Sequence, residues 1–157
     1  MLRKDREITD FSEIVKIIEK CKVCRVGLID GDMPYVLPLN FGYDVQDGVI
    51  TVYFHSARAG LKLDILRSRP NACFEVDCEH GLIPSDIACR NGFLFASVIG
   101  QGTAEIIEDA EEQAYALNRV LLHEAGREYE IRPAMTKIVT LWKIRLDRVY
   151  GKRRDKL

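Results

Sequence analysis

Hydrophobic residues recur along this chain with two different periods, and the change of period predicts where helices and strands lie. Apolar residues follow helical spacing over about residues 10–20 and 109–126, and residues 60–68 form a shorter leucine-rich segment that stops before a proline. Asp10 and Asp109 each precede a glutamate by three residues, which is the spacing of a capping box at a helix start. We therefore predict three helices over these segments.

Six further segments have the β-branched composition or the two-residue alternation of strands, namely 23–29, 34–43, 49–55, 72–78, 93–107 and 138–146. Turn signals at Asp30-Gly31 and Asp47-Gly48 join the first three into a meander. Gly100 and Gly102 predict a bend or bulge in the fifth strand. The stretch over 79–91 has no clear period, so we predict a long loop there.

The order of these elements favours a mostly β protein over a parallel α/β sheet, because strands and helices do not alternate strictly. In the last strand, the residues expected on one buried face are Ile138, Thr140, Trp142, Ile144 and Leu146. We predict an antiparallel six-stranded barrel with about three helices outside it. The length of 157 residues suits a single domain over residues 1–157, with a solvated C-terminal tail over about 151–157.

The charge pattern argues against a nucleic-acid target. The net charge is -1, and the one compact basic run, Lys152 to Arg154 with Lys156, falls in the predicted tail. The N-terminus lacks the apolar segment of a signal peptide, and no apolar run approaches the roughly 18 residues that span a bilayer. Five cysteines form an odd set without a secretion signal. We expect reduced thiols, no membrane association and a cytoplasmic location.

Familiar motifs do not explain the chain, which has no glycine-rich dinucleotide fingerprint, phosphate loop, His-Glu-x-x-His or nucleophile elbow. Cys21 and Cys24 have the spacing of a redox or metal-binding pair. A second pair at zinc spacing is missing, so no metal is predicted. Two ordinary buried thiols also agree with this spacing.

Residues 55–62 join a strand end to a helix start and include an imidazole, a hydroxyl and two cations. Helix N-termini bind anions, because their N–H groups and the helix dipole favour negative charge. Ser56, Arg58 and Lys62 would add donors to such a site. A capped helix with solvated surface cations is the alternative, and His55 likewise suits either a structural or a catalytic role.

Three blocks carry a family resemblance: Asp32–Tyr43, then Val52–Ala57 with Gly60 and Lys62, then Asn71–Glu75. Together they resemble the nitroimidazole-resistance (Nim) proteins, a group within the pyridoxamine 5'-phosphate oxidase-like flavoproteins. The likeness extends from Arg3 to Lys152 and so covers nearly the whole chain. It implies a split β-barrel that forms a homodimer, with two FMN molecules held in clefts between the subunits.

The resemblance also assigns expected roles to single residues. Pro38, Leu39 and Asn40 would lie along the flavin ring, His55 and Ser56 would flank the ring and ribityl chain, and Leu61 and Lys62 would lie at the phosphate. Leu61 stands where the family usually has an arginine. Ser97 and Trp142 would approach the cofactor from the partner subunit, although a large aromatic on an apolar strand face also suits core packing.

The activity implied by the resemblance is that of an FMN-dependent oxidoreductase of the nitroreductase type. It would reduce a small nitro-aromatic acceptor with electrons from NAD(P)H or from a redox protein, and His55 would be the proton donor, since an imidazole titrates near neutral pH. Two alternatives remain at this point. One is a flavin- or haem-binding carrier or sensor without turnover, and the other is a structural dimer with an empty cleft.

Overall fold

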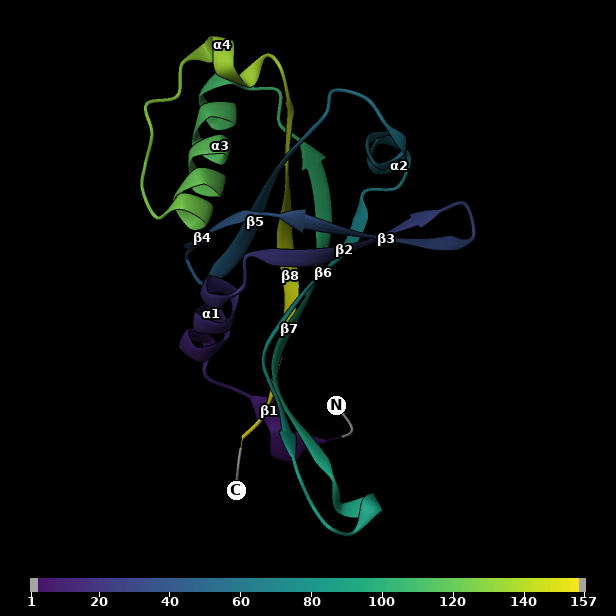
Figure 1. Cartoon of the computed structure of the whole chain (residues 1–157). Coiled ribbons are helices and arrows are strands. Elements are labelled where there is room, and N and C mark those ends of the chain that lie inside the picture. The colour runs from purple at the N-terminus through teal and green to yellow at the C-terminus, as the bar shows by residue number, and fades with distance from the viewer. Residues whose placement is uncertain (1–2, 156–157) are drawn as a thin grey trace.

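The computed structural model describes residues 3–155, which form one antiparallel sheet flanked by helices (Figure 1). The strands are β1 (Glu7–Ile8), β2 (Val23–Asp30), β3 (Met33–Asn40), β4 (Gly42–Gln46), β5 (Val49–Ser56), β6 (Asn71–Ile83), β7 (Gly92–Ile106) and β8 (Thr140–Arg154). The helices are α1 (Phe11–Lys20), α2 (Leu61–Ser68), α3 (Ala110–Ala125) and α4 (Pro133–Thr136), with 3-10 turns η1 (Lys4–Arg6) and η2 (Ala88–Arg90). The three predicted helices are therefore confirmed.

The sheet has the order β3-β2-β6-β7-β8-β5-β4, with β1 added against β8, and its two end strands do not pair with each other. The sheet therefore curves without closing, which is a split β-barrel and confirms the predicted fold class. All six predicted strands are present. The structure adds β1 and divides one prediction in two, which gives eight strands in the described part of the chain.

The divided prediction is the strand over 34–43, which separates into β3 and β4 at Phe41. Phe41 is fully buried, and its ring packs edge-on against Phe74 with centroids 5.3 Å apart. On one side of Phe41 the chain pairs with β2, and on the other side it pairs with β5. The apolar segment over 34–43 thus pairs with two different strands, although its sequence pattern is continuous.

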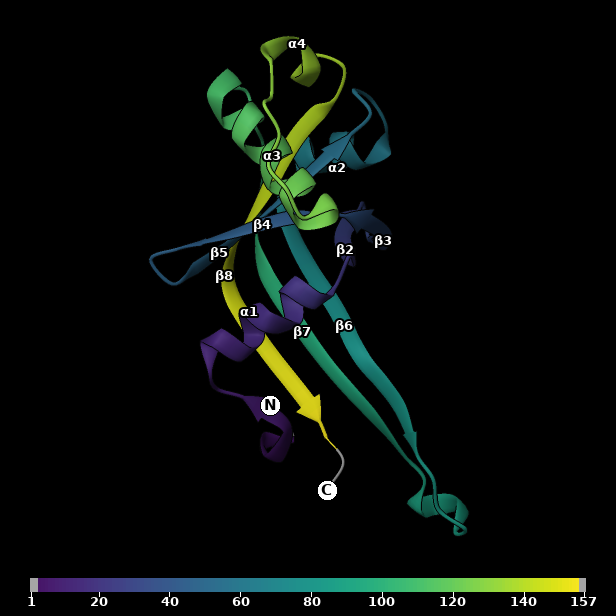
Figure 2. The same ribbon diagram turned by 60° about the vertical axis from the view of Figure 1, so that its left-hand side comes forward.

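The predicted loop over 79–91 is too long, because residues 79–83 belong to β6, which forms a two-stranded arm with the start of β7 (Figure 2). β6 continues to Ile83 and β7 begins at Gly92, so only a short tip joins them. The pairing is shifted between Cys78 and Gly81, and Glu79 has a left-handed backbone with φ of 61°. This irregularity interrupts the two-residue alternation, which explains why the sequence showed no period there.

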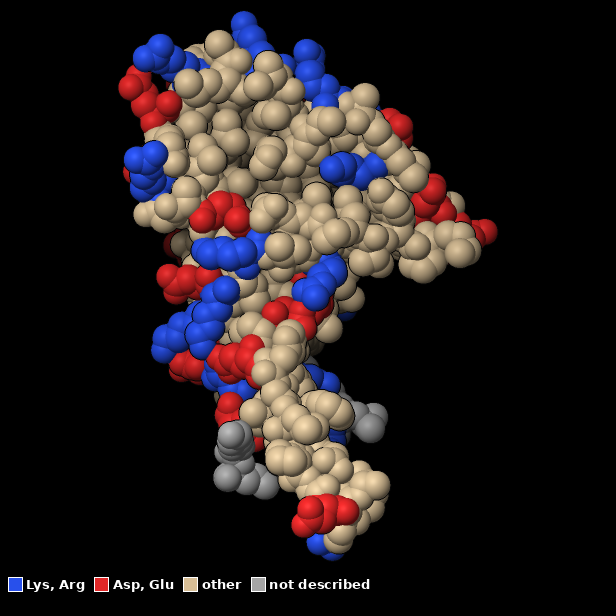
Figure 3. Space-filling model, in the orientation of Figure 1, with Lys and Arg blue, Asp and Glu red and all other residues tan. Residues whose placement is uncertain are grey.

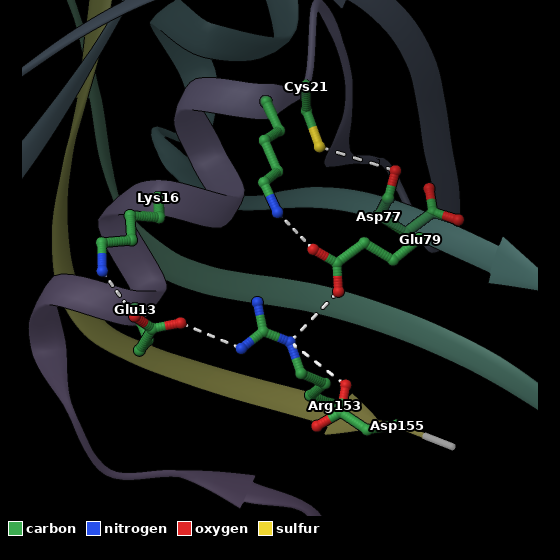
Figure 4. A network of polar contacts seen from close by, with 8 residues as sticks. Glu13, Lys16, Cys21, Asp77, Glu79, Arg153 and Asp155 are labelled. Carbon is green, nitrogen blue, oxygen red and sulfur yellow. Dashed lines mark hydrogen bonds and ion pairs between the residues drawn. The ribbon is translucent and has the colours of Figure 1, made fainter.

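The predicted solvated tail over 151–157 is also wrong for residues 151–154, which belong to β8, while Lys156 lies outside the described residues. Gly151 pairs with Ile8 of β1, and Lys152 pairs with Ser97 of β7. Arg153 then binds Glu13 of α1 at 2.9 Å and Glu79 of the arm at 3.1 Å (Figure 4). The end of β8 thus holds α1 and the base of the arm together.

Replacing Arg153 with Gln should lower stability at neutral pH, and this loss should vanish in acid. Pairing with Lys16 and with Arg153 lowers the pKa of Glu13 to about 2 from 4.5, and pairing with Lys20 lowers the pKa of Glu79. A carboxyl with a depressed folded-state pKa stabilises the fold above its unfolded-state pKa, and this stability is lost as the pH falls through the folded-state value. Urea unfolding of the two proteins should therefore differ at neutral pH and converge between about pH 4.5 and pH 2.

Arg145→Gln is the matched control, because Arg145 lies on the same strand and its pair with Asp147 is largely exposed. Exposed pairs contribute little, so this variant should unfold nearly as the wild type does at every pH. A difference for Arg153→Gln that persists unchanged to pH 2 would contradict the role assigned to the two carboxylates.

The interior of the barrel is the main core, and a second apolar cluster lies between α3 and the sheet. Trp142 is fully buried and stacks on Phe54 with ring centroids 4.1 Å apart. Leu141 is also buried, because α3 covers the opposite face of β8. Ile138, expected on the same buried face as Trp142, is 75% exposed because it precedes the strand.

The predicted bend in the fifth strand is confirmed by a register shift between Gln101 and Gly102, where β7 pairs with β8. A side chain at Gly102 would begin 1.9 Å from the carbonyl oxygen of Arg145, so glycine is required where the two backbones approach. The bulge lets two 15-residue strands bend together along the barrel.

Candidate functional site

The start of α2 differs from the starts of α1 and α3 in having no capping side chain. Asp10 accepts a hydrogen bond from the Ser12 N–H and Asp109 accepts one from the Glu112 N–H, each at 2.8 Å. The N-cap of α2 is Gly60, which provides no side-chain acceptor and has φ of 138°, a backbone geometry that glycine tolerates best. The first N–H groups of α2 are therefore left for a ligand or solvent.

Two polar groups near this helix start have no partner among residues 3–155. The Ser56 side chain is only 7% exposed, and its hydroxyl makes no hydrogen bond. The Lys62 ammonium is half-buried and makes no ion pair, and burial lowers the pKa of Lys62. A buried hydroxyl and a desolvated cation without partners both cost free energy, which an anion at this place would offset.

The neighbouring predicted residues are exposed. His55 lies beside Ser56 at the end of β5, with its side chain in solvent, and Leu61 is exposed at the first turn of α2. The other cations of this helix are engaged, since Arg67 pairs with Asp64 and Arg69 donates to the Gly31 carbonyl. Lys62 is therefore the cation of α2 that is available to a ligand.

Pro38, Leu39 and Asn40 lie on β3, which ends the strand order and has a free outer edge. Prolines are common on such edges because they lack an N–H for a neighbouring strand. The Asn40 amide donates to the Lys22 carbonyl at 3.1 Å and to Glu124 at 3.0 Å, so it is already bound within the chain. The backbone of β3, rather than the Asn40 side chain, is what this edge presents.

The last two predicted residues lie apart from these. Ser97 is half-buried on β7, opposite Asp77 and Lys152 in the adjacent strands. Trp142 is enclosed in the barrel core, so the structure gives its side chain a packing role. Within the described residues, Ser56 at the end of β5 and Lys62 in α2 have no partners, and no cavity described below gathers the nine predicted residues.

The cavities of the chain are lined by other residues. A cavity of about 550 Å³ lies over Gly27, Ala72, Cys73 and Gly102, on β2, β6 and β7. A second cavity of about 750 Å³ separates α3 from β4, and an adjoining one of about 420 Å³ shares Gln46 and Tyr115 with it. None of these linings includes a predicted cofactor residue.

The larger cavity contains a polar group that sequence reasoning missed. Asp44 accepts hydrogen bonds from the hydroxyls of Tyr53 at 3.0 Å and Tyr115 at 2.7 Å. Burial raises the pKa of both tyrosines, and Asp44 raises both further. His123, also in the lining, contacts the Cys21 carbonyl at 2.7 Å, and burial lowers its pKa. These residues lie far apart in the sequence, so no local motif indicated them.

An open antiparallel barrel with this strand order defines the class of split-barrel proteins. The family model of pyridoxamine 5'-phosphate oxidase matches residues 10–153. The chain belongs to the pyridoxamine 5'-phosphate oxidase-like family, and the resemblance inferred from sequence is confirmed.

Solved structures agree with this assignment. A candidate 5-nitroimidazole antibiotic resistance protein from Bacteroides thetaiotaomicron is 32% identical, with a TM-score of 0.78 over 96% of this chain and 90% of that one. A flavocytochrome from Azotobacter vinelandii is 22% identical, with a TM-score of 0.77 over 96% and 70% of the two chains. An FAD- and haem-binding protein from Mycobacterium smegmatis is 17% identical, with a TM-score of 0.79 over 96% and 74%. The last two show the shared fold alone.

No curated protein matches the chain. Within residues 3–155, no helix is both long and apolar enough to cross a membrane. The same residues contain no cluster of three or more histidine, cysteine or acidic side chains that could hold a metal. In the view of Figure 3, acidic and basic side chains are interleaved around α1 instead of forming a patch of one sign.

Proposed function

We propose that this protein binds FMN and uses it to reduce a small nitro-aromatic acceptor. The observation that carries the proposal is the turn from β5 into α2, where Ser56 and Lys62 have no partners within residues 3–155 and no side chain caps the first N–H groups of α2. A phosphate dianion matches these donors in charge and in hydrogen-bonding capacity. The 32% identical relative, described as a candidate nitroimidazole resistance protein, supports the acceptor class.

Different residues of this chain would bind different parts of the cofactor. Lys62 and the first N–H groups of α2 would hold the phosphate, with Ser56 as a further donor. Backbone groups on the free edge of β3, around Leu39 and Asn40, would hydrogen-bond the polar edge of the ring. When bound, the flavin supplies the electron transfer to the acceptor. His55 is exposed beside Ser56, where it would donate a proton to the reduced acceptor.

A second copy of the chain would complete the cleft. The three cavities described above are not lined by the proposed cofactor residues, which supports a ring wall supplied from elsewhere. Large apolar side chains are exposed on the β2–β3 hairpin and on the arm, including Ile29, Met33, Val36, Leu82 and Phe93. Exposed apolar patches of this kind are typical of subunit interfaces.

The visible spectrum of the purified full-length protein tests the proposal. We expect two flavin bands, bleaching on anaerobic addition of NADPH or NADH, and recovery on addition of a nitroimidazole with formation of its amine. Flavin bands without turnover by either donor or by a reduced redox protein would favour a carrier, and a Soret band would favour a haem protein. A colourless protein that takes up no FMN would overturn the proposal.

Replacing His55 with Ala should reduce nitroimidazole turnover by about 10²-fold or more with FMN still bound, because a positioned proton donor contributes on that order. The measurement is the turnover number of flavin-loaded protein under anaerobic conditions. His80→Ala is the control, because His80 is also exposed but pairs with Asp77 on β6. Unchanged turnover in His55→Ala would remove His55 from the reaction.

A further inference from the structure

Two thiols from distant parts of the chain meet where the end of α1 lies against β6. Cys21 follows the last residue of α1 and is 6% exposed, and Cys78 lies on β6 just before the register shift at the base of the arm. Cys21 Sγ lies 3.5 Å from the carbonyl oxygen of Asp77, the residue before Cys78 (Figure 4). Cys78 packs against the core cluster to which Cys21 belongs.

Neighbouring residues repeat this contact. Lys20, directly before Cys21, forms an ion pair with Glu79, directly after Cys78. Two successive residues at the end of α1 therefore meet two successive residues of β6 in antiparallel sense. Arg153 binds the other oxygen of Glu79 and fixes the same place from β8 (Figure 4). The approach of the two cysteines is thus held by three elements and does not depend on one flexible side chain.

Cys24, which the sequence suggested as the partner of Cys21, is directed elsewhere. It lies on β2, is fully buried, and its sulfur is 3.4 Å from the carbonyl oxygen of Leu39. The strand alternation of β2 points Cys24 into the barrel core. The Cys21-x-x-Cys24 spacing is therefore coincidental, and the thiol that can react with Cys21 is 57 residues away.

We propose that Cys21 and Cys78 are a reversible redox modification site, which closes to a disulfide when a small-molecule disulfide is present. Cys78, the more exposed thiol, would lose its proton and attack one sulfur of the small disulfide, releasing one equivalent of free thiol. The Cys21 thiolate would then attack the sulfur of Cys78 in this mixed disulfide and release the second equivalent. Two electrons pass from the two cysteines to the small disulfide, and excess free thiol reverses both steps.

The local chemistry sets the pace of this reaction. Burial raises the pKa of both thiols, that of Cys21 to about 12, so the reactive thiolates are scarce at neutral pH. The positive charges of Lys20 and Arg153 lower the pKa of Cys78 and so oppose the effect of burial. The site should therefore close slowly and selectively. Cytosolic disulfides of this kind are usually transient and redox-sensing, not structural.

Closure would link residues 21–78, a segment that contains β2 to β5, α2 and most of β6. Such a bond restricts the unfolded chain, and the effect grows with the length of the closed loop. The oxidised protein should therefore melt several degrees above the reduced protein. The base of the arm would also be covalently linked to the end of α1, in addition to the ion pairs that already join them.

The test is oxidation of the folded full-length protein with oxidised glutathione over a graded ratio to reduced glutathione, followed by alkylation and peptide mass mapping. We expect a peptide pair joined through Cys21 and Cys78, with a mass loss of two hydrogens, and its disappearance in excess dithiothreitol. Cys89→Ser is the matched control, because Cys89 is exposed on the arm and should be dispensable for the link.

Cys21→Ser should retain glutathione on Cys78 as a stable mixed disulfide, which identifies the attacking and resolving thiols. Cys21→Ser and Cys89→Ser each replace a sulfur atom by an oxygen atom. A melting curve of each reduced variant checks that it folds. A link between Cys21 and Cys24 would overturn the proposal. So would a folded wild-type protein in which Cys21 and Cys78 remain free at every glutathione ratio.

Discussion

Lys62→Met should weaken FMN binding by about 10- to 150-fold while leaving riboflavin binding nearly unchanged. A hydrogen bond to a charged group contributes roughly 1.5–3 kcal/mol, and each 1.4 kcal/mol is a factor of ten in affinity. Lys62 is half-buried and has no partner in the described part of the chain, so its charge is available to a phosphate. Riboflavin lacks the phosphate and reports on the ring and ribityl contacts alone. Titration of apoprotein with each flavin, followed by fluorescence, measures both affinities.

Arg67→Met is the matched control for this experiment, because Arg67 lies one turn further along α2 and pairs with Asp64 at 3.1 Å. It removes the same charge from the same helix and should leave both affinities within a factor of two or three. Equal losses of FMN and riboflavin binding in Lys62→Met would point to a disturbed helix rather than a lost phosphate contact. Unchanged FMN binding would place the phosphate away from α2.

Trp142→Ala should destabilise the protein by about 3–5 kcal/mol, the usual cost of removing a large buried aromatic side chain. Trp142 is fully buried and stacked on Phe54, so its loss leaves a cavity in the barrel that the surrounding strands cannot readily fill. Its indole N–H makes no hydrogen bond, so Trp142→Phe should retain much of the stability by keeping the ring contact. Urea unfolding monitored by circular dichroism measures both values.

Ile138→Ala is the control for the packing effect, since the sequence pattern placed Ile138 and Trp142 on the same face. Ile138 is 75% exposed and should change the free energy of unfolding by no more than about 0.5 kcal/mol. Comparable losses at both positions would mean that the strand begins earlier and buries Ile138 as the alternation predicted. A small loss for Trp142→Ala would contradict its place in the core.

The sequence by itself determined the elements and the family, because both depend on local signals. Helical periodicity and the caps at Asp10 and Asp109 located α1 and α3. The turn signals located the hairpins β2–β3 and β4–β5, but these lie at opposite ends of the strand order, so the predicted meander is wrong. The blocks around Pro34 and His55 carried the resemblance that the family match confirms. Each of these signals lies within a few residues, where steric and hydrogen-bonding preferences act without knowledge of distant partners.

The tertiary structure decided everything that depends on which strands become neighbours. The pairing of β6 with β7 turned a segment without period into an arm, and the pairing of β8 with β1 and β7 turned a predicted tail into strand. The tertiary structure also distinguished the predicted cofactor residues from one another. Among the described residues, Ser56 at the end of β5 and Lys62 in α2 have no partners, whereas Trp142 is enclosed in the core.

Strand pairing also explains the Arg153 ion-pair cluster and the cysteine pair, which no sequence motif indicated. Arg153 meets Glu13 and Glu79, and Cys21 meets Cys78, across separations of more than fifty residues. Local preferences cannot encode such meetings, because they follow from strand register, and register is set by the burial of whole faces over many residues. The sequence therefore predicted an anion site at a helix start. Only the folded barrel shows that, within residues 3–155, the donors Ser56 and Lys62 have no partner.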